Sequence, residues 1–146
     1  MVTMAQITRL NRANQAKLDQ LNALARQLAP GYGVISRARL ANVIKSGNTE
    51  VWIAEDDGKI IGMGVLVVYT LLMKNVVAFI EEVVVDTNRR GEGVGRAIME
   101  KLIERAKFHK VQHIELTSRP TRVVANKMYQ KLGFEQRDTN VYRLSL

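Results

Sequence analysis

Residues 75–107 contain three patterns in direct succession, and this succession limits the fold more than any other feature of the sequence. The run "NVVAFIEEVVVD" is typical of a strand covered on both faces, "NRRGEGVG" is a glycine-rich loop, and residues 95–107 carry apolar side chains at helical spacing. A strand, a glycine loop and a helix in this order commonly bind phosphate, because the first N–H groups of a helix are free and its dipole is positive there. The sequence therefore predicts a phosphate site at residues 90–96.

The other elements predict a mixed α/β layer structure and not a doubly wound parallel sheet, because strands come consecutively first and alternate with helices only later. Strands are expected at residues 4–10, 50–56, 59–69, 75–86, 111–118, 134–137 and 141–146. Helices are expected at residues 11–28, between Ser36 and Gly47, and at 95–107 and 121–132. No linker or repeat divides the sequence, so residues 1–146 are expected to form one domain.

The composition excludes several classes of site. Cysteine is absent, which excludes disulfides, thiolate zinc sites and a cysteine nucleophile, and the two histidines, His109 and His113, are too few to predict a metal site. No signal-peptide pattern and no apolar run near the ~20 residues of a membrane span is found, so a cytoplasmic protein without membrane contact is expected. The net charge of +8 favours anionic partners, either nucleic acid or a phosphorylated cofactor, unless it is only a generally basic surface.

Three phosphate-loop patterns were compared with "RRGEGVGR". A P-loop needs Lys-Ser or Lys-Thr after its glycines, which this loop lacks. A dinucleotide fingerprint fits at Gly91 and Gly93, but its third glycine position falls on Arg96; Glu115, roughly where a ribose-binding acid is expected, keeps this alternative open. The pattern R-x-x-G-x-G fits at every defined position. It predicts a pyrophosphate cradle with added charge from Arg89, made by Arg90, Gly91, Glu92, Gly93, Val94, Gly95 and Arg96.

The loop and its surroundings resemble the GNAT acyltransferases, which bind acetyl-coenzyme A. "IEEVVVD" precedes the loop at the family's spacing, and "ANKMYQKLGFE" resembles the family pattern A-x-x-x-Y-x-K-x-G-F, so the resemblance covers roughly residues 77–137. It implies an α/β fold of the α+β type with a mixed, mostly antiparallel sheet of roughly six to seven strands and about four helices. The sheet would splay between its fourth and fifth strands, and acetyl-CoA would be the cofactor.

The resemblance also assigns roles to residues of this sequence. Backbone groups of Val83, Val84 and Val85 would pair with the pantetheine arm of the cofactor, whereas the residues alone indicate only buried strand positions. Tyr129 matches a family tyrosine that lies near the cofactor sulfur, and a phenol with a pKa of about 10 can protonate a departing thiolate. The alternative for Tyr129 is a core aromatic residue beside Phe134.

A general base is also needed, because a protonated amine cannot attack a thioester. Glu81 and Glu82 interrupt an apolar strand, where an unpaired carboxylate is costly to bury. Adjacent strand residues face opposite sides, so at most one of them is expected in the acceptor cleft. The placement resembles an Ile-Glu-Asp stretch of glucosamine-phosphate acetyltransferases in the same family, and Glu82 is preferred over Glu81. The alternative is that one glutamate is solvated and the other paired with an arginine.

Two positions depart from the family pattern. Arg122 stands where the family often has asparagine, and Thr117 stands where relatives that acetylate protein N-termini carry a glutamate base. Threonine cannot act as that base, so the mechanism of those relatives is not expected. Arg119 and Arg122 would hold either a cofactor phosphate or an acidic group of the acceptor.

The sequence thus predicts an acetyl-CoA-dependent N-acetyltransferase that moves an acetyl group directly to a primary amine of a small molecule or peptide. Two alternatives are a GNAT-like module that binds coenzyme A without turnover and a basic nucleic-acid-binding domain. The aromatic content of 5% disfavours the latter, and no nucleic-acid partner is expected. The acceptor-binding parts carry no motif, although the basic balance favours an acceptor with an acidic group. A homodimer is compatible with this fold.

Overall fold

The computed structural model describes residues 5–146, so Met4 of the predicted first strand lies outside the described residues. Its elements are β1 (Gln6–Arg9), α1 (Gln15–Leu28), α2 (Arg37–Lys45), β2 (Thr49–Asp56), β3 (Lys59–Leu71), β4 (Asn75–Val85), the 3-10 turn η1 (Thr87–Arg89), α3 (Val94–Phe108), β5 (Ile114–Glu115) and α4 (Val123–Lys131). The chain divides into two compact units, one up to Leu116 and one from Thr117 to Leu146.

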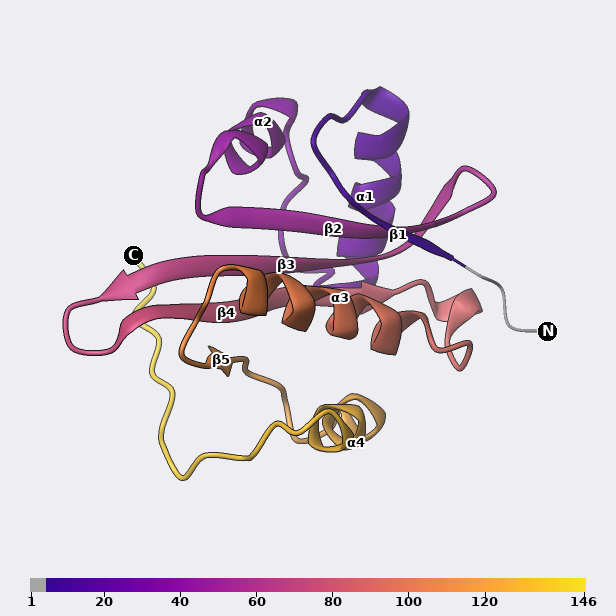
Figure 1. Cartoon of the computed structure of the whole chain (residues 1–146). Coiled ribbons are helices and arrows are strands. Elements are labelled where there is room, and N and C mark those ends of the chain that lie inside the picture. The colour runs from indigo at the N-terminus through magenta and orange to yellow at the C-terminus, as the bar shows by residue number, and fades with distance from the viewer. Residues whose placement is uncertain (1–4) are drawn as a thin grey trace. The chain divides into compact units, whose positions relative to one another are not determined.

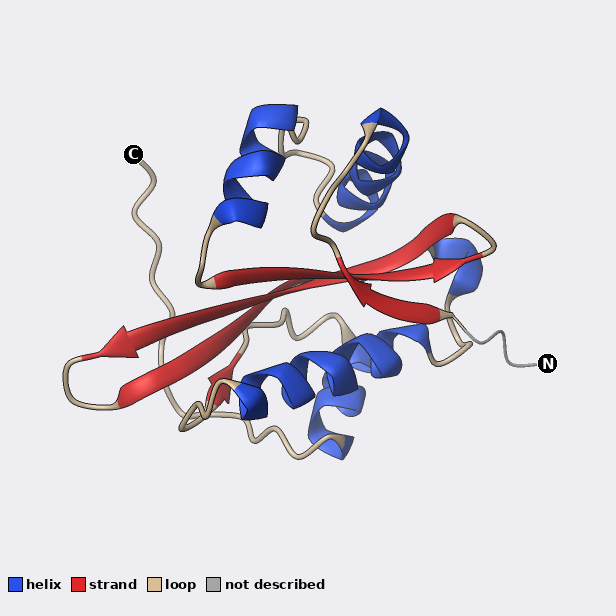
Figure 2. Ribbon diagram, turned by 45° about the horizontal axis from the view of Figure 1, so that its top comes forward, coloured by secondary structure: helices blue, strands red, loops and turns tan. Residues whose placement is uncertain are grey.

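The first unit is a mixed sheet with helices on both faces. The strands lie in the order β1-β2-β3-β4-β5, and every pair is antiparallel except β4 with β5. Helices α1 and α2 cover one face and α3 covers the other (Figures 1 and 2). The middle of β3 is therefore covered on both faces, as predicted, whereas Tyr69 to Leu71 at its hairpin end are exposed. The mixed, mostly antiparallel sheet and the four helices are confirmed.

The predicted number of six to seven strands is wrong, because the described residues form five. Residues 134–137 and 141–146 form no strand, and Val141, Tyr142 and Leu144 are exposed. Alternating apolar residues favour a strand only where a neighbouring strand supplies hydrogen bonds, since β-propensity depends strongly on context. The two C-terminal strands were therefore predicted wrongly, because the sequence does not show whether a neighbouring strand is available to pair with them.

The fifth strand is much shorter than the predicted 111–118. It pairs with β4 only at Ala78↔Ile114 and Phe79↔Glu115. Three residues further along β4, the pairing with β3 shifts between Val65↔Glu81 and Met63↔Val84. Glu82 lies in this irregularity with φ of 54°, in the left-handed region. This is a β-bulge, which bends a strand and interrupts regular pairing, and it lies just beyond the point where the pairing with β5 ends.

The core lies on both faces of the central strands. On one face, Met63, Val65 and Val84 pack with Leu18, Leu21 and other residues of α1 and α2. On the other face, a Cβ added at Gly64 would meet Ile98 at 2.8 Å and Leu102 at 2.9 Å. Glycine at this position thus lets α3 approach the sheet closely. Among residues 5–146, no helix combines the length and apolar character that a membrane crossing requires.

A buried carboxylate joins the C-terminal end of α3 to the sheet. Glu50 of β2 is 3% exposed and accepts two hydrogen bonds from Arg105, at 2.9 and 3.0 Å. The indole of Trp52 donates to it at 2.8 Å and His109 donates at 2.7 Å. Burial by itself raises the pKa of Glu50, but the hydrogen bonds from Arg105, His109 and Trp52 and the charge of Arg9 outweigh it and lower the pKa to about 2.

We expect Glu50 to make the stability depend on pH between about 5 and 2. Because its folded pKa lies below the value of 4.5 for an unperturbed glutamate, the ionised form stabilises the fold above pH 4.5, and this stabilisation is lost as the pH falls through 4.5 toward 2. When Glu50 is fully ionised, its lowered pKa contributes about 3 kcal/mol to the free energy of unfolding. Urea unfolding of the wild type and Glu50→Gln at pH 7, 5 and 3 measures it, since the gap between the two should narrow as the pH falls. A gap that stays constant would contradict this assignment.

Candidate functional site

The glycine loop is held to the first unit by several contacts at its start. Asp86 caps η1 by accepting from the Asn88 N–H at 3.1 Å, and its own N–H donates to the Ile61 carbonyl at 2.9 Å. The Thr87 N–H donates to the side chain of Gln27 on α1 at 2.9 Å. Asp86 is buried, and the Asn88 hydrogen bond, opposed by burial and assisted by Lys59, lowers its pKa. The loop therefore starts from a fixed point at the end of β4.

The loop then presents a row of free backbone donors. Within the part of the chain that the structure describes, the N–H groups from Arg90 to Arg96 donate no hydrogen bond, and the first bond of α3 runs from Ala97 to the Gly93 carbonyl. Gly91 and Gly93 have φ of 81° and 83°, a conformation that a side chain would strain. A Cβ at either glycine would meet nothing within 4 Å. The loop thus combines open space with donors at a helix N-terminus, which suits an anion.

The three arginines predicted to surround the anion differ in their partners. Arg89 is paired with Asp56 and Glu92, and Arg96 is paired with Glu100 at 2.8 Å. Among the described residues, Arg90 has no carboxylate partner, and its Nε lies 3.5 Å from the Val85 carbonyl oxygen. Glu92, predicted within the cradle, turns its carboxylate to Arg89. Arg90 is therefore the arginine of the three whose charge is not neutralised by a neighbour.

The three valines before the loop bury their side chains fully or in part, but their backbone has no pairing strand on the β5 edge of β4 within the first unit. The side chains of Val83 and Val84 are buried, and Val85 is half-buried. Val84 and Val85 pair with Met63 and Gly62 of β3, whereas β5 pairs no further along β4 than Phe79. The side chains are thus used in the core, and the backbone of this part of β4 faces no strand on its other edge within the first unit.

The bulge sets where the two glutamates lie. Glu81 pairs with Val65, whose side chain packs under α1 and α2, so Glu81 lies on that face of the sheet. Val84 packs in the same cluster although it is three residues further on, because Glu82 is the extra residue of the bulge. Both glutamates are exposed. Strict alternation, on which the expectation of at most one glutamate in the acceptor cleft rested, does not hold at this point of β4.

Tyr129 belongs to the second unit. It lies on α4, is 6% exposed, and its ring meets that of Phe134 edge to face at 6.1 Å between centroids. Burial raises the pKa of Tyr129, and the charge of Arg122 only partly opposes this, so the phenol keeps its proton at neutral pH. Asn126 donates to the Arg119 carbonyl at 2.9 Å and thereby closes the turn before α4.

Sequence reasoning missed two supports of the loop, Asp86 and Gln27. An aspartate directly after a strand and two residues before an asparagine is a turn signal that could have identified Asp86. Gln27 carried no signal, because its role depends on where α1 crosses the end of β4.

The two histidines contact carboxylates, His109 with Glu50 and His113 with Glu115 at 3.7 Å.

Known proteins are similar to this chain in sequence and in fold. The model of the acetyltransferase (GNAT) family matches residues 19–134. N-acetylaspartate synthetase of Xenopus tropicalis is 30% identical over 84 residues, which are 58% of this chain, and the chain spans about 30% of that relative's length.

Two solved structures show the same fold. A putative acetyltransferase from Agrobacterium tumefaciens has a TM-score of 0.84 and 23% identity, and the match covers 96% of this chain and 99% of that chain. The aminoglycoside N-acetyltransferase AAC(6')-Iy in complex with CoA has a TM-score of 0.78 and 21% identity, with 97% and 94% covered. Because the family model spans most of the sequence, including the strand, the glycine loop and the tyrosine helix, the chain belongs to the acetyltransferase (GNAT) family.

Proposed function

We propose that this chain is an acetyl-CoA-dependent N-acetyltransferase that moves an acetyl group directly to a primary amine. The observation that carries the proposal is the row of free N–H groups from Arg90 to Arg96 at the start of α3, with Arg90 beside it. Such a row suits a pyrophosphate, and the family relative solved with CoA supports coenzyme A as its source. The family model crosses the boundary between the two units, which supports treating residues 1–146 as one acetyltransferase domain.

The acceptor amine is proposed to approach on the face that carries α1 and α2. The phosphate cradle begins α3, which covers the opposite face, so the two substrates would reach β4 from different sides (Figure 2). Bound acetyl-CoA supplies an activated acetyl thioester. Backbone N–H groups of Val83 to Val85 are proposed to hold the pantetheine arm and to stabilise the oxyanion that develops on the acetyl carbonyl.

Two side chains are proposed to move protons. Glu81 lies on the α1 and α2 face and is exposed, which supports it as the proposed base that takes a proton from the amine, directly or through water. Glu82, one residue away in the bulge, is the second candidate for this base. Tyr129 would give its proton to the departing thiolate, a role that suits a phenol whose pKa is raised by burial.

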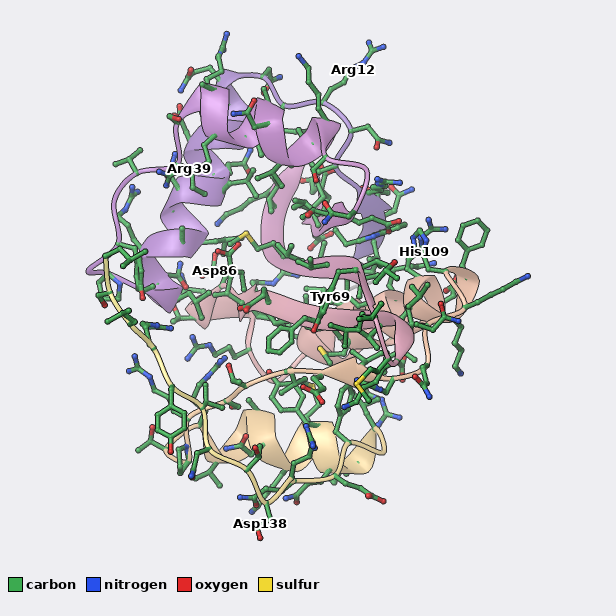
Figure 3. The ribbon with its side chains drawn as sticks, turned by 90° about the vertical axis from the view of Figure 1, so that its left-hand side faces the viewer. Arg12, Arg39, Tyr69, Asp86, His109 and Asp138 are labelled. Carbon is green, nitrogen blue, oxygen red and sulfur yellow. The ribbon has the colours of Figure 1, made fainter. Side chains whose placement is uncertain are left out.

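The charge of the α1 and α2 layer favours an acceptor with an acidic group. Residues 11–48 contain six basic residues against one acidic residue, Asp19: Arg12, Lys17, Arg26, Arg37, Arg39 and Lys45. Lys17 is paired with Glu55, and within the described residues the other five have no carboxylate partner. Figure 3 shows Arg12 and Arg39 on this layer. The compounds in the relatives' names differ in charge, since aspartate is an acid and aminoglycosides are polycations, and a cationic layer attracts an acid.

Two glutamate variants identify the base. We expect Glu81→Gln to lower kcat by roughly 10²- to 10⁴-fold, the usual contribution of a general base, and Glu82→Gln to lower it by less than about tenfold. Thiol release from acetyl-CoA in the presence of an amine panel measures both. The reverse ranking would assign the base to Glu82. Binding of coenzyme A without thiol release for any amine would favour the non-catalytic module instead.

Removal of the Tyr129 hydroxyl tests the proposed acid. We expect Tyr129→Phe to lower kcat at least tenfold, since general acid catalysis contributes about 10²-fold or more, while the Kd for coenzyme A stays nearly unchanged. Tyr142→Phe is the matched control, because Tyr142 is exposed in the C-terminal segment and its loss should leave kcat unchanged. Equal rates for the wild type and Tyr129→Phe would show that the tyrosine is only a core residue.

Matched acceptor pairs test the substrate class. Aspartate against asparagine, and glucosamine 6-phosphate against glucosamine, differ in one acidic group each. For whichever pair is acetylated, we expect the acidic member to have a kcat/KM at least about tenfold higher than its partner at low salt. This ratio of the two kcat/KM values should fall as salt screens the charges. The double variant Arg37→Gln/Arg39→Gln should reduce the ratio. A preference for neutral amines or for spermidine would contradict the assignment.

A further inference from the structure

The first of the two consecutive arginines in the loop does not face the anion cradle as a free charge. Arg89 Nη2 lies 2.7 Å from Asp56 Oδ2, and Arg89 Nε lies 2.8 Å from Glu92 Oε2. Its side chain is only 21% exposed. The hydrogen bond to Asp56, followed by that to Glu92, raises the pKa of Arg89. One guanidinium therefore joins two carboxylates that are far apart in the sequence.

These contacts tie the glycine loop to the end of β2. Asp56 is the last residue of β2, and Glu92 stands between Gly91 and Gly93, both of which have left-handed backbones. Glycines leave a loop many conformations, so a cradle built on them needs an anchor if its N–H groups are to be arranged before the ligand arrives. Glu92 lies between these two glycines, and its side chain gives the loop a point of attachment, because Arg89 binds its carboxylate.

The same contacts also settle the charge of the loop. An unpaired Glu92 carboxylate beside a pyrophosphate would repel it, and pairing with Arg89 neutralises that charge. Arg90, which has no carboxylate partner among the described residues, remains as the cation for the ligand. The two neighbouring arginines thus have different partners although the sequence presents them as a pair.

We propose that Arg89 is a positioning residue for coenzyme A, which fixes Glu92 and the N–H groups around it and makes no contact with the phosphates. This inference rests on the proposed function. The competing possibility is that Arg89 leaves its carboxylates and pairs with the pyrophosphate directly. The two differ in what happens when Asp56, at the other end of the tether, is removed.

Calorimetric titration with coenzyme A separates these possibilities. If electrostatics alone mattered, Asp56→Ala would strengthen coenzyme A binding, because it removes a carboxylate near the anion site. If a released Arg89 contacted the pyrophosphate, Asp56→Ala would also strengthen binding. Positioning predicts the opposite, a weakening of about tenfold for Asp56→Ala that is similar to that for Arg89→Gln. The double variant should be no weaker than either single variant, because both break one tether. Glu100→Ala, which removes a carboxylate paired with Arg96 outside the tether, is the matched control and should not weaken binding.

Salt dependence gives a second readout that a purely structural role would not change in this way. Arg90→Gln should weaken binding and reduce its dependence on salt, whereas the double variant Arg89→Gln/Glu92→Gln, which removes a neutral ion pair, should weaken binding with the salt dependence of the wild type. Tighter binding by Asp56→Ala, or a reduced salt dependence in Arg89→Gln/Glu92→Gln, would overturn the proposal. A wild-type chain that binds no coenzyme A would overturn the proposed function and this inference together, and is distinguished because it concerns the wild type.

Discussion

The bulge at Glu82 is the constraint on which the arrangement of β4 depends. Before it, β4 pairs with β3 on one side and with β5 on the other, at Ala78 and Phe79. After it, β4 pairs only with β3 within the first unit, and the backbone of Val83 to Val85 has an open edge. A regular strand would have continued the ladder on both sides and left no room for a ligand to add itself as a strand. The extra residue thus lies where β4 changes from a strand paired on both edges to one that, within the first unit, pairs only with β3.

The proposed phosphate cradle relies on backbone groups more than on charged side chains. The three loop arginines indicated a cationic pocket, but two of them are neutralised by Asp56, Glu92 and Glu100. What remains is Arg90 and the N–H groups at the start of α3, which carry the positive end of the helix dipole. Backbone donors are fixed in direction by the fold, whereas an exposed arginine must lose rotamer freedom to bind. This division explains how a loop with glutamate in its centre can still suit an anion.

Patterns that depend on neighbours in sequence were predicted well, and those that depend on neighbours in space were not. Ser36 caps α2 and the Asp57-Gly58 turn joins β2 to β3, as the local residues indicated. The family pattern around Arg90 and Tyr129 identified the family, because it spans a strand, a loop and two helices in order. The two-residue β5, the absence of a strand in residues 134–146 and the pairing of Arg89 with Asp56 depend on which segments meet in space, and no local pattern of residues records this. The bulge at Glu82, which breaks the alternation of side chains along β4, could not be predicted for the same reason.

The first turn of α3 has no side-chain cap, so the helix depends on contacts along its length and at its C-terminal end. Gly93 occupies the N-cap position and offers no side-chain hydrogen bond, which leaves the helix without a contribution typically worth about 1 kcal/mol. A capping side chain would occupy the N–H groups that a ligand needs, so the helix must be stabilised elsewhere. The close approach at Gly64 packs its middle against β3, and Glu50 binds Arg105 and His109 at its far end. Fixing α3 along its length and at its C-terminus keeps its N-terminus in place beside the loop without using any of the donors there.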